Sequence, residues 1–175
     1  MFLGFSSMNT PKDPDPRELA TTLEQAGFES LWYGEHSHIP RCLSTPYPAG
    51  GEMPQPYKEM MDPYLSLMAA ATATTTLKLG TGIALLCERE LFSQANTIAC
   101  LDRLRNGRLM IGPGVGWNKE EFENVSHIPF KKRYKGMQEI VAATRTLFNE
   151  EAPEFHGAFI DFVPVWLEPK PVPKN

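Results

Sequence analysis

Apolar strand-like segments and amphipathic helix-like segments alternate four times along this chain of 175 residues, and this alternation constrains the fold more than any other feature. Short apolar segments, which predict strands, occupy residues 3–7, 31–33, 77–86 and 108–111. Apolar residues at helical spacing predict helices over residues 16–26, 63–71, 93–104 and 133–148. Strands that alternate with helices form parallel sheets with right-handed crossovers. The sequence therefore predicts an α/β fold of four βα units.

Two of the predicted helices begin with the same signal. Asp15-Pro16 and Asp62-Pro63 each place an aspartate, a preferred N-cap residue, before a proline, which suits the first helical position. Gly27 follows the first of these helices, where glycine commonly ends a helix. These signals predict where the first two helices begin and where the first of them ends.

Four βα units are compatible with two parallel architectures. One is a small doubly wound sheet, and the other is half of a (β/α)8 barrel, a fold that typically needs about 250 residues. A small hairpin is predicted around Gly157, followed by an extended proline-rich segment. The residues alone leave both architectures open.

Residues 38–61 interrupt the alternation with a proline-rich segment that is too long for an ordinary connection. Loops of this length commonly serve as lids or binding loops, and this one carries Tyr47, Met53 and Tyr57. We expect it to cover a ligand pocket. The alternative is a structural loop that packs against a neighbouring subunit.

The charge balance argues against some classes of partner. With 17 Lys and Arg against 21 Asp and Glu, the net charge is −4, whereas proteins that bind nucleic acid or anionic membranes favour a basic face. No apolar run approaches the ~20 residues of a membrane span, and the N-terminus lacks the basic segment of a signal peptide. The three cysteines are widely spaced, which fits reduced thiols. We expect a cytoplasmic protein that acts on a small molecule.

Histidines follow the second predicted strand, and the carboxyl ends of strands hold the sites of parallel α/β folds. His36 is a candidate acid–base group because imidazole titrates near neutral pH. His36 and His38 together could supply two metal ligands, but a metal site needs a third and usually a fourth donor. An ordinary loop histidine is the alternative for His36.

Glycines mark the third and fourth predicted strands. Gly80 and Gly82 weaken a strand interior, and the close approach of a flat ligand is the favoured explanation over a bulge or helix packing. The fourth strand runs into GPGVGW at residues 112–117, which departs from the dinucleotide-binding pattern because Trp117 stands where a glycine is required. These glycines still permit a ring or phosphate to approach the backbone, and Trp117 is either a stacking residue or a core residue.

These segments together resemble the luciferase-like monooxygenase superfamily, and most closely its branch of oxidoreductases that use the deazaflavin coenzyme F420. The resemblance covers nearly the whole chain. It is carried by GEH (34–36), LGTGI (79–83), LDRL (101–104), NGR (106–108), GPGVGW (112–117), EEF (120–122), Arg133 and PKP (169–171).

The resemblance implies a (β/α)8 barrel of which residues 1–175, as one domain, hold the first four βα units and stop before the fifth strand. It implies a coenzyme F420, or alternatively FMN, lying across the carboxyl ends of the strands, with a cis peptide bond between Gly82 and Ile83 beneath the ring. His36 is the expected catalytic residue, and no metal is expected. The expected cofactor-binding residues are Thr81, Gly82, Ile83, Gly112, Gly114, Gly116 and Trp117. Pro113 departs from the family pattern and removes a backbone donor.

The function that the resemblance implies is hydride transfer between F420 and a small organic substrate. Because members of the family often dimerise, the resemblance also raises the possibility of a homodimer. Three alternatives stay open. They are an FMN-dependent monooxygenase of the same superfamily, a metal-dependent barrel hydrolase that uses His36 and His38, and a truncated barrel without catalysis.

Overall fold

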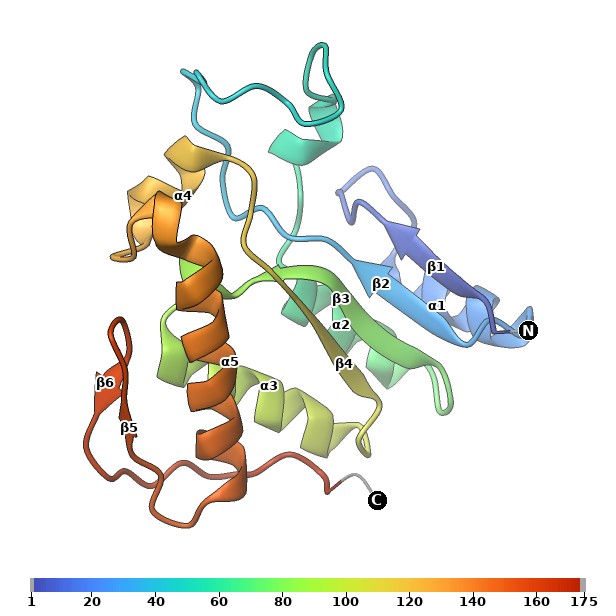
Figure 1. Ribbon diagram of the computed structural model, residues 1–175. Helices are drawn as coiled ribbons and strands as arrows, with labels where there is room; N and C mark the ends of the chain where they lie inside the picture. The colour runs from blue at the N-terminus through green and yellow to red at the C-terminus, as the bar shows by residue number, and fades with distance from the viewer. Residues whose placement is uncertain (1, 174–175) are drawn as a thin grey trace. The chain divides into compact units, whose positions relative to one another are not determined.

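The computed structural model describes residues 2–173 and contains the predicted alternation of strands and helices (Figure 1). In chain order the elements are β1 (Gly4–Ser7), α1 (Pro16–Gln25), β2 (Ser30–Tyr33), the short 3-10 helix η1 (Gln55–Lys58), α2 (Pro63–Thr72), β3 (Lys78–Leu85), η2 (Leu86–Glu88), α3 (Leu91–Leu104), β4 (Leu109–Gly114), α4 (Lys119–Val125), η3 (Phe130–Lys132), α5 (Arg133–Asn149), β5 (Phe155–His156) and β6 (Asp161–Phe162).

The first four strands form one sheet in the order β1-β2-β3-β4, and β1, β2 and β3 run parallel. In the register, Leu31 of β2 lies opposite Leu79 of β3, and Tyr33 lies opposite Thr81. The predicted hairpin around Gly157 is also present, as the antiparallel pair of β5 and β6. The predicted α/β class with parallel strands is confirmed, and the structure adds the order of the strands.

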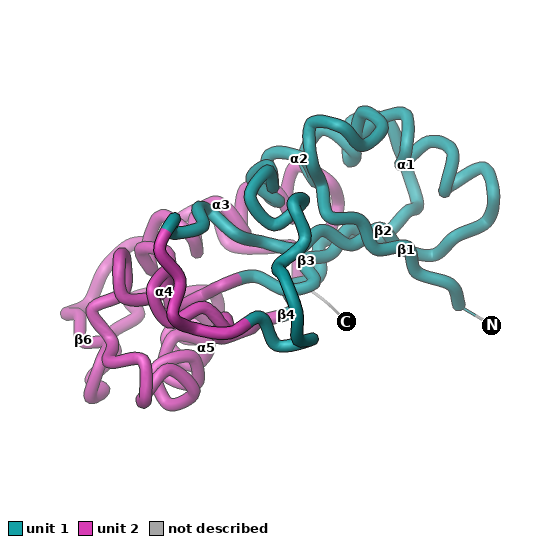
Figure 2. Tube along the Cα trace, turned by 90° about the horizontal axis from the view of Figure 1, so that it is seen from above, with its two compact units in different colours: residues 1–41, 47–84, 108–112 teal, residues 42–46, 85–107, 113–175 magenta. Residues whose placement is uncertain are grey.

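The chain divides into two compact units, which Figure 2 shows in different colours. Unit 1 comprises residues 1–41, 47–84 and 108–112. Its core is formed by buried side chains of α1, β2, α2 and β3, and α1 packs against α2. These core residues are Ala20, Leu23, Leu31, Tyr33, Leu67, Ala70, Ala71 and Leu79.

Unit 2 comprises residues 42–46, 85–107 and 113–175, and its core lies where α3 packs against α5. The buried side chains of these two helices include Ala95, Ile98, Ala99, Ile140, Ala143 and Leu147, and Phe122 of α4 is also buried and packs against Phe130. Lys170 closes α5 by donating to the carbonyls of Leu147, at 2.7 Å, and Glu150, at 2.8 Å. The buried Asp102 of α3 accepts from the N–H of Val172 at 3.0 Å. Lys170 and Asp102 belong to PKP and LDRL, two of the motifs that carry the family resemblance, and their hydrogen bonds attach the C-terminal segment to α5 and α3.

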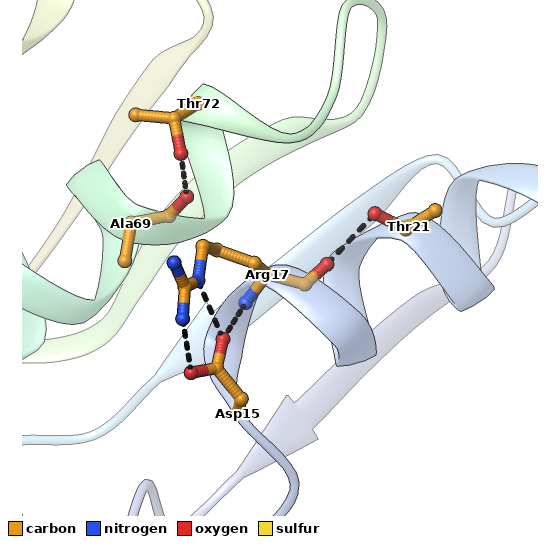
Figure 3. A network of polar contacts seen from close by, with 5 residues as sticks. All are labelled: Asp15, Arg17, Thr21, Ala69 and Thr72. Atoms are coloured by element: carbon orange, nitrogen blue, oxygen red, sulfur yellow. Dashed lines mark hydrogen bonds and ion pairs between the residues drawn. The ribbon is translucent and has the colours of Figure 1, made fainter.

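The predicted aspartate caps are confirmed. Asp15 accepts from the N–H of Arg17 at 2.9 Å and also binds the Arg17 guanidinium through two contacts of 2.9 Å, as Figure 3 shows. Asp62 accepts from the N–H of Leu65 at 3.0 Å at the start of α2. Each cap satisfies an N–H group that would otherwise lack a partner within its helix.

The main differences from the prediction are the start of α3, the end of β4 and the presence of α4. The helix predicted from residue 93 begins at Leu91, because Glu90 accepts from the N–H groups of Phe92 and Ser93, and glutamate is not among the preferred caps. The strand β4 continues past the predicted end to Gly114, and it tolerates Pro113 because it is the outer strand of the sheet within residues 2–173. The seven-residue helix α4 was not predicted.

No helix among residues 2–173 is long and apolar enough to cross a membrane.

Candidate cofactor-binding site

In unit 1, the pairing of β2 with β3 ends at Tyr33 and Thr81, and each of these residues is followed by a glycine. Tyr33, the last residue of β2, pairs with Thr81, so Gly34 and Gly82 come directly after the paired segment. A Cβ atom built on Gly34 would lie 3.5 Å from the carbonyl oxygen of Gly82 and 3.5 Å from Cε of Met60. The backbone at Gly34 therefore lies close to that at Gly82, directly after the paired segment of β2 and β3.

The peptide bond between Gly82 and Ile83 is cis, as the family resemblance implied. Gly82 is exposed, and the Ile83 side chain is 43% exposed, although Leu79 and Leu85 of the same strand are buried. Gly82 and Ile83 thus expose a stretch of backbone and one apolar side chain within β3. Such a surface suits contact with a planar apolar group.

His36 lies half-buried three residues after the end of β2, and its ring packs against that of Tyr57. The two ring centroids are 5.3 Å apart, and the rings are inclined at 58°. The nearby His38 instead contacts the Ser37 hydroxyl through Nδ1 at 2.9 Å. Among residues 2–173, no three His, Cys, Asp or Glu side chains form a group that could hold a metal ion.

Thr81 and Gly112 lock β3 to β4. The Thr81 side chain is fully buried, and its hydroxyl accepts from the N–H of Gly112 at 3.1 Å. A Cβ atom on Gly112 would lie only 2.5 Å from the carbonyl oxygen of Thr81, so the approach of the two strands requires glycine there. Their predicted contacts with a cofactor stay predictions, and the Gly112 N–H already has a protein partner.

The interpretation of Gly80 as a site of ligand approach is wrong. A Cβ atom on Gly80 would lie 2.2 Å from Cε3 of Trp32, because the indole ring occupies that space. Trp32 lies opposite Gly80 in the register of β2 and β3, so their side chains point to the same face of the sheet. Gly80 therefore accommodates a neighbouring side chain, and the signal for this was the tryptophan in the preceding strand.

The remaining predicted cofactor residues belong to unit 2. Gly114 is buried, Trp117 is half-buried, and Gly116 adopts the left-handed conformation, with φ of 69°. A Cβ atom on Gly116 would lie 2.8 Å from Oε1 of Glu88. Glu88 lines a cavity of about 330 Å³ within unit 2, between the start of α3 and the hairpin of β5 and β6. Gly116 thus borders a residue of that cavity, while His36 belongs to unit 1.

The predicted lid segment has contacts in both units. Its residues 42–46 belong to unit 2, where Glu120 accepts from the N–H of Ser44 at 2.9 Å and from that of Thr45 at 3.2 Å, and also binds the Ser44 hydroxyl. These bonds, led by the Ser44 hydroxyl, lower the pKa of Glu120 to about 2. Residues 47–61 belong to unit 1 and carry Tyr57 against His36. Sequence reasoning identified the segment, and it named Glu120 only within the motif EEF, not as a partner of Thr45, which lies 75 residues away.

Several known proteins are similar to this chain. An uncharacterized protein of Mycobacterium tuberculosis is 34% identical over 98% of this chain and 62% of its own length. The 4-hydroxyprotoasukamycin monooxygenase of Streptomyces nodosus is 29% identical over 77% of this chain and 32% of that enzyme.

Solved structures share the fold. The monooxygenase RslO1 of Streptomyces bottropensis superposes with a TM-score of 0.80 at 25% identity, over 99% of this chain and 51% of that one. An F420-dependent secondary alcohol dehydrogenase superposes with a TM-score of 0.76 at 22% identity, over 99% of this chain and 50% of the dehydrogenase. The chain thus spans about half the length of these solved structures.

These likenesses decide between the two parallel architectures, because the four-stranded sheet and its helices match part of the barrel of these relatives. The family model of the luciferase-like monooxygenases matches residues 6–175, which is nearly the whole chain. The chain belongs to the luciferase-like monooxygenase family.

Proposed function

We propose that this chain forms the strand-end part of the active site of an oxidoreductase that transfers hydride between coenzyme F420 and a small organic substrate. The observation that carries the proposal is the position of His36 beside the end of β2, with the exposed Gly82–Ile83 surface directly after the paired segment of β3. The likeness to a dehydrogenase that is described as F420-dependent supports the choice of cofactor.

The residues present fit a flat deazaflavin ring. Gly34 and Gly82 carry no side chains at the strand ends, and Ile83 adds an exposed apolar side chain beside them. We expect the ring to rest on Gly82 and Ile83, where it meets apolar surface rather than charge. When bound, F420 supplies a carbon that carries hydride, and the protein supplies orientation and the electrostatic environment.

His36 provides the proton chemistry in this proposal. Oxidation of an alcohol or reduction of a carbonyl moves a proton at the substrate oxygen as well as a hydride at carbon. The half-buried imidazole of His36 can exchange that proton through a ring nitrogen. His36 is therefore assigned the role of general acid or base toward the substrate oxygen.

The cofactor assignment is tested by fluorescence titration of the purified chain with F420 and, separately, with FMN. We expect saturable binding of F420 that is tighter than binding of FMN. The proposal is wrong if the chain binds FMN more tightly, or if it binds neither compound.

The assignment of His36 is tested with His36→Gln. We expect turnover with F420 to fall by about 10²–10⁴-fold, the usual contribution of general acid–base catalysis, while F420 affinity stays unchanged. His127→Gln, in unit 2, is the matched control and should leave both quantities unchanged. Undiminished turnover in His36→Gln would remove the role.

A second function has its own support. Two named relatives, RslO1 and the 4-hydroxyprotoasukamycin enzyme, are monooxygenases, which favours an FMN-dependent oxygenation on the same site. This function requires substrate-dependent consumption of O₂ with reduced FMN, whereas hydride transfer with F420 proceeds under anaerobic conditions. Measurement of O₂ uptake separates the two.

A further inference from the structure

The ring of Tyr57 contacts two other aromatic rings of unit 1, those of His36 and Tyr47. The ring of His36 packs against that of Tyr57 at 5.3 Å between centroids, and the ring of Tyr57 packs edge-on against that of Tyr47 at 5.4 Å. The hydroxyls of Tyr47 and Tyr57 also share a hydrogen bond of 3.2 Å. This hydrogen bond and partial burial both raise the pKa of Tyr57, so its phenol stays protonated at neutral pH. Tyr57 thus contacts both Tyr47 and His36.

The segment that carries Tyr57 is fixed to the loop between β1 and α1. Glu59, two residues after Tyr57, forms an ion pair with Lys12 at 2.8 Å and accepts from Gln55 at 3.0 Å. Met61 donates its N–H to the carbonyl of Asn9 at 2.8 Å, and the Asn9 side chain donates back to the Met61 carbonyl at 3.0 Å. Asn9 is 1% exposed, so this pair of bonds is shielded from water.

The backbone around Tyr57 is also ordered locally. Tyr57 lies in the 3-10 helix η1, and its N–H donates to the carbonyl of Pro54 at 3.2 Å. Pro54 and Pro56 restrict the backbone on both sides of Gln55. A side chain held by a short helix, an anchored C-terminal flank and a hydrogen-bonded neighbour loses little further freedom when it contacts another ring. Tyr57 can therefore hold His36 in place before any ligand binds.

We propose that Tyr57 is a positioning residue, which fixes the orientation of the His36 imidazole through ring contact, and that Tyr47 holds Tyr57 in place. The inference rests on the proposed function in one respect, namely that His36 acts on the substrate. Misplacement of a catalytic group by about 1 Å can cost about 10²-fold in rate, so a ring that holds the imidazole has a kinetic consequence. In this proposal the proline-rich segment contributes to catalysis through His36.

The direct test is the NMR spectrum of the histidine side chains, which needs neither cofactor nor substrate. The chain has 4 histidines, so His36→Gln identifies the His36 signals by their disappearance. Tyr57→Leu removes the ring, and we expect the His36 signals to move while those of His127 and His156 stay. Tyr57→Phe keeps the ring and should leave the His36 signals close to their parent positions.

The kinetic test uses the same variants with F420 and substrate. We expect Tyr57→Leu to lower kcat by about 10²-fold with F420 affinity unchanged, and Tyr57→Phe to restore most of kcat. Tyr134→Leu, a change of the same type at an exposed position of α5 in unit 2, should leave kcat unchanged. If Tyr57→Leu fails to fold, Tyr47→Phe takes its place, because it removes only the hydroxyl that holds Tyr57 and should move the His36 signals in the same direction.

The outcomes separate this inference from the proposed function. His36 signals that do not move in Tyr57→Leu overturn the inference, whatever the turnover. Signals that move while kcat stays at the parent value also overturn it, because His36 is then contacted without being positioned for catalysis. Moved signals in a chain that binds neither F420 nor FMN overturn the proposed function and leave the ring contact established.

Discussion

Arg108 closes the C-terminal end of α2, and its replacement should destabilise unit 1. The guanidinium donates through Nη1 to the Thr74 hydroxyl at 3.1 Å and the Leu77 carbonyl at 2.8 Å. Through Nη2 it donates to the carbonyls of Ala71, at 3.2 Å, and Thr74, at 3.0 Å. Carbonyls at the end of a helix have no partner within the helix, and a cation there is also favoured by the helix dipole. One side chain thus satisfies four acceptors around the turn that joins α2 to β3.

The size of the effect follows from these contacts. A hydrogen bond to a charged group contributes a net ~1.5–3 kcal/mol, but four bonds that share one half-buried guanidinium do not add independently. We therefore expect Arg108→Ala to lower the free energy of unfolding by about 3 kcal/mol, which corresponds to a fall of about 6–12 °C in Tm for a domain of this size. Arg108→Lys should cost about half as much, because one ammonium cannot span all four acceptors.

The assay is urea unfolding at pH 7, followed by circular dichroism. Arg103→Ala, at an exposed position of α3, is the matched control and should change the free energy of unfolding by less than about 0.5 kcal/mol. If Arg108→Ala is as stable as this control, the four contacts contribute no net stability and the reasoning is refuted.

Two further predictions concern packing and pH. Gly80→Ala should lower the free energy of unfolding by about 1–3 kcal/mol, because the new methyl group meets the Trp32 ring, and most of that loss should vanish in a Trp32→Leu background; an equal loss in both backgrounds would contradict this account. Glu24 accepts from the N–H groups of residues 75–77, and although partial burial raises its pKa, these bonds outweigh burial and lower the pKa to about 2. Its contribution to stability is present above the unfolded pKa of about 4.5 and is lost as the pH falls toward 2, so Glu24→Gln should flatten the stability profile in that window. Glu52→Gln, in an exposed loop, should keep the parent slope in the same acid titration of unfolding.

The amino-acid sequence determined the features of this protein that depend on neighbouring residues. The aspartate caps of α1 and α2 were predicted correctly, as was the start of α5 at Arg133, because caps and apolar periodicity act over a few residues. The parallel pairing of the strands followed from the alternation itself, whereas their order in the sheet came from the structure. The cis bond between Gly82 and Ile83 was expected only through the family resemblance.

The tertiary structure alone decided the contacts that join distant parts of the chain. Sequence position placed Gly80 near a ligand, whereas strand register places it against Trp32. Nothing local to Arg108 indicates that it closes a helix more than 30 residues earlier, and nothing local to Tyr57 indicates that it packs on His36. Such contacts depend on which elements the fold brings together, and a pattern of neighbouring residues does not indicate which distant residues will meet. The sequence therefore determined the elements and the candidate histidine, and the packing of the elements decided what holds that histidine in place.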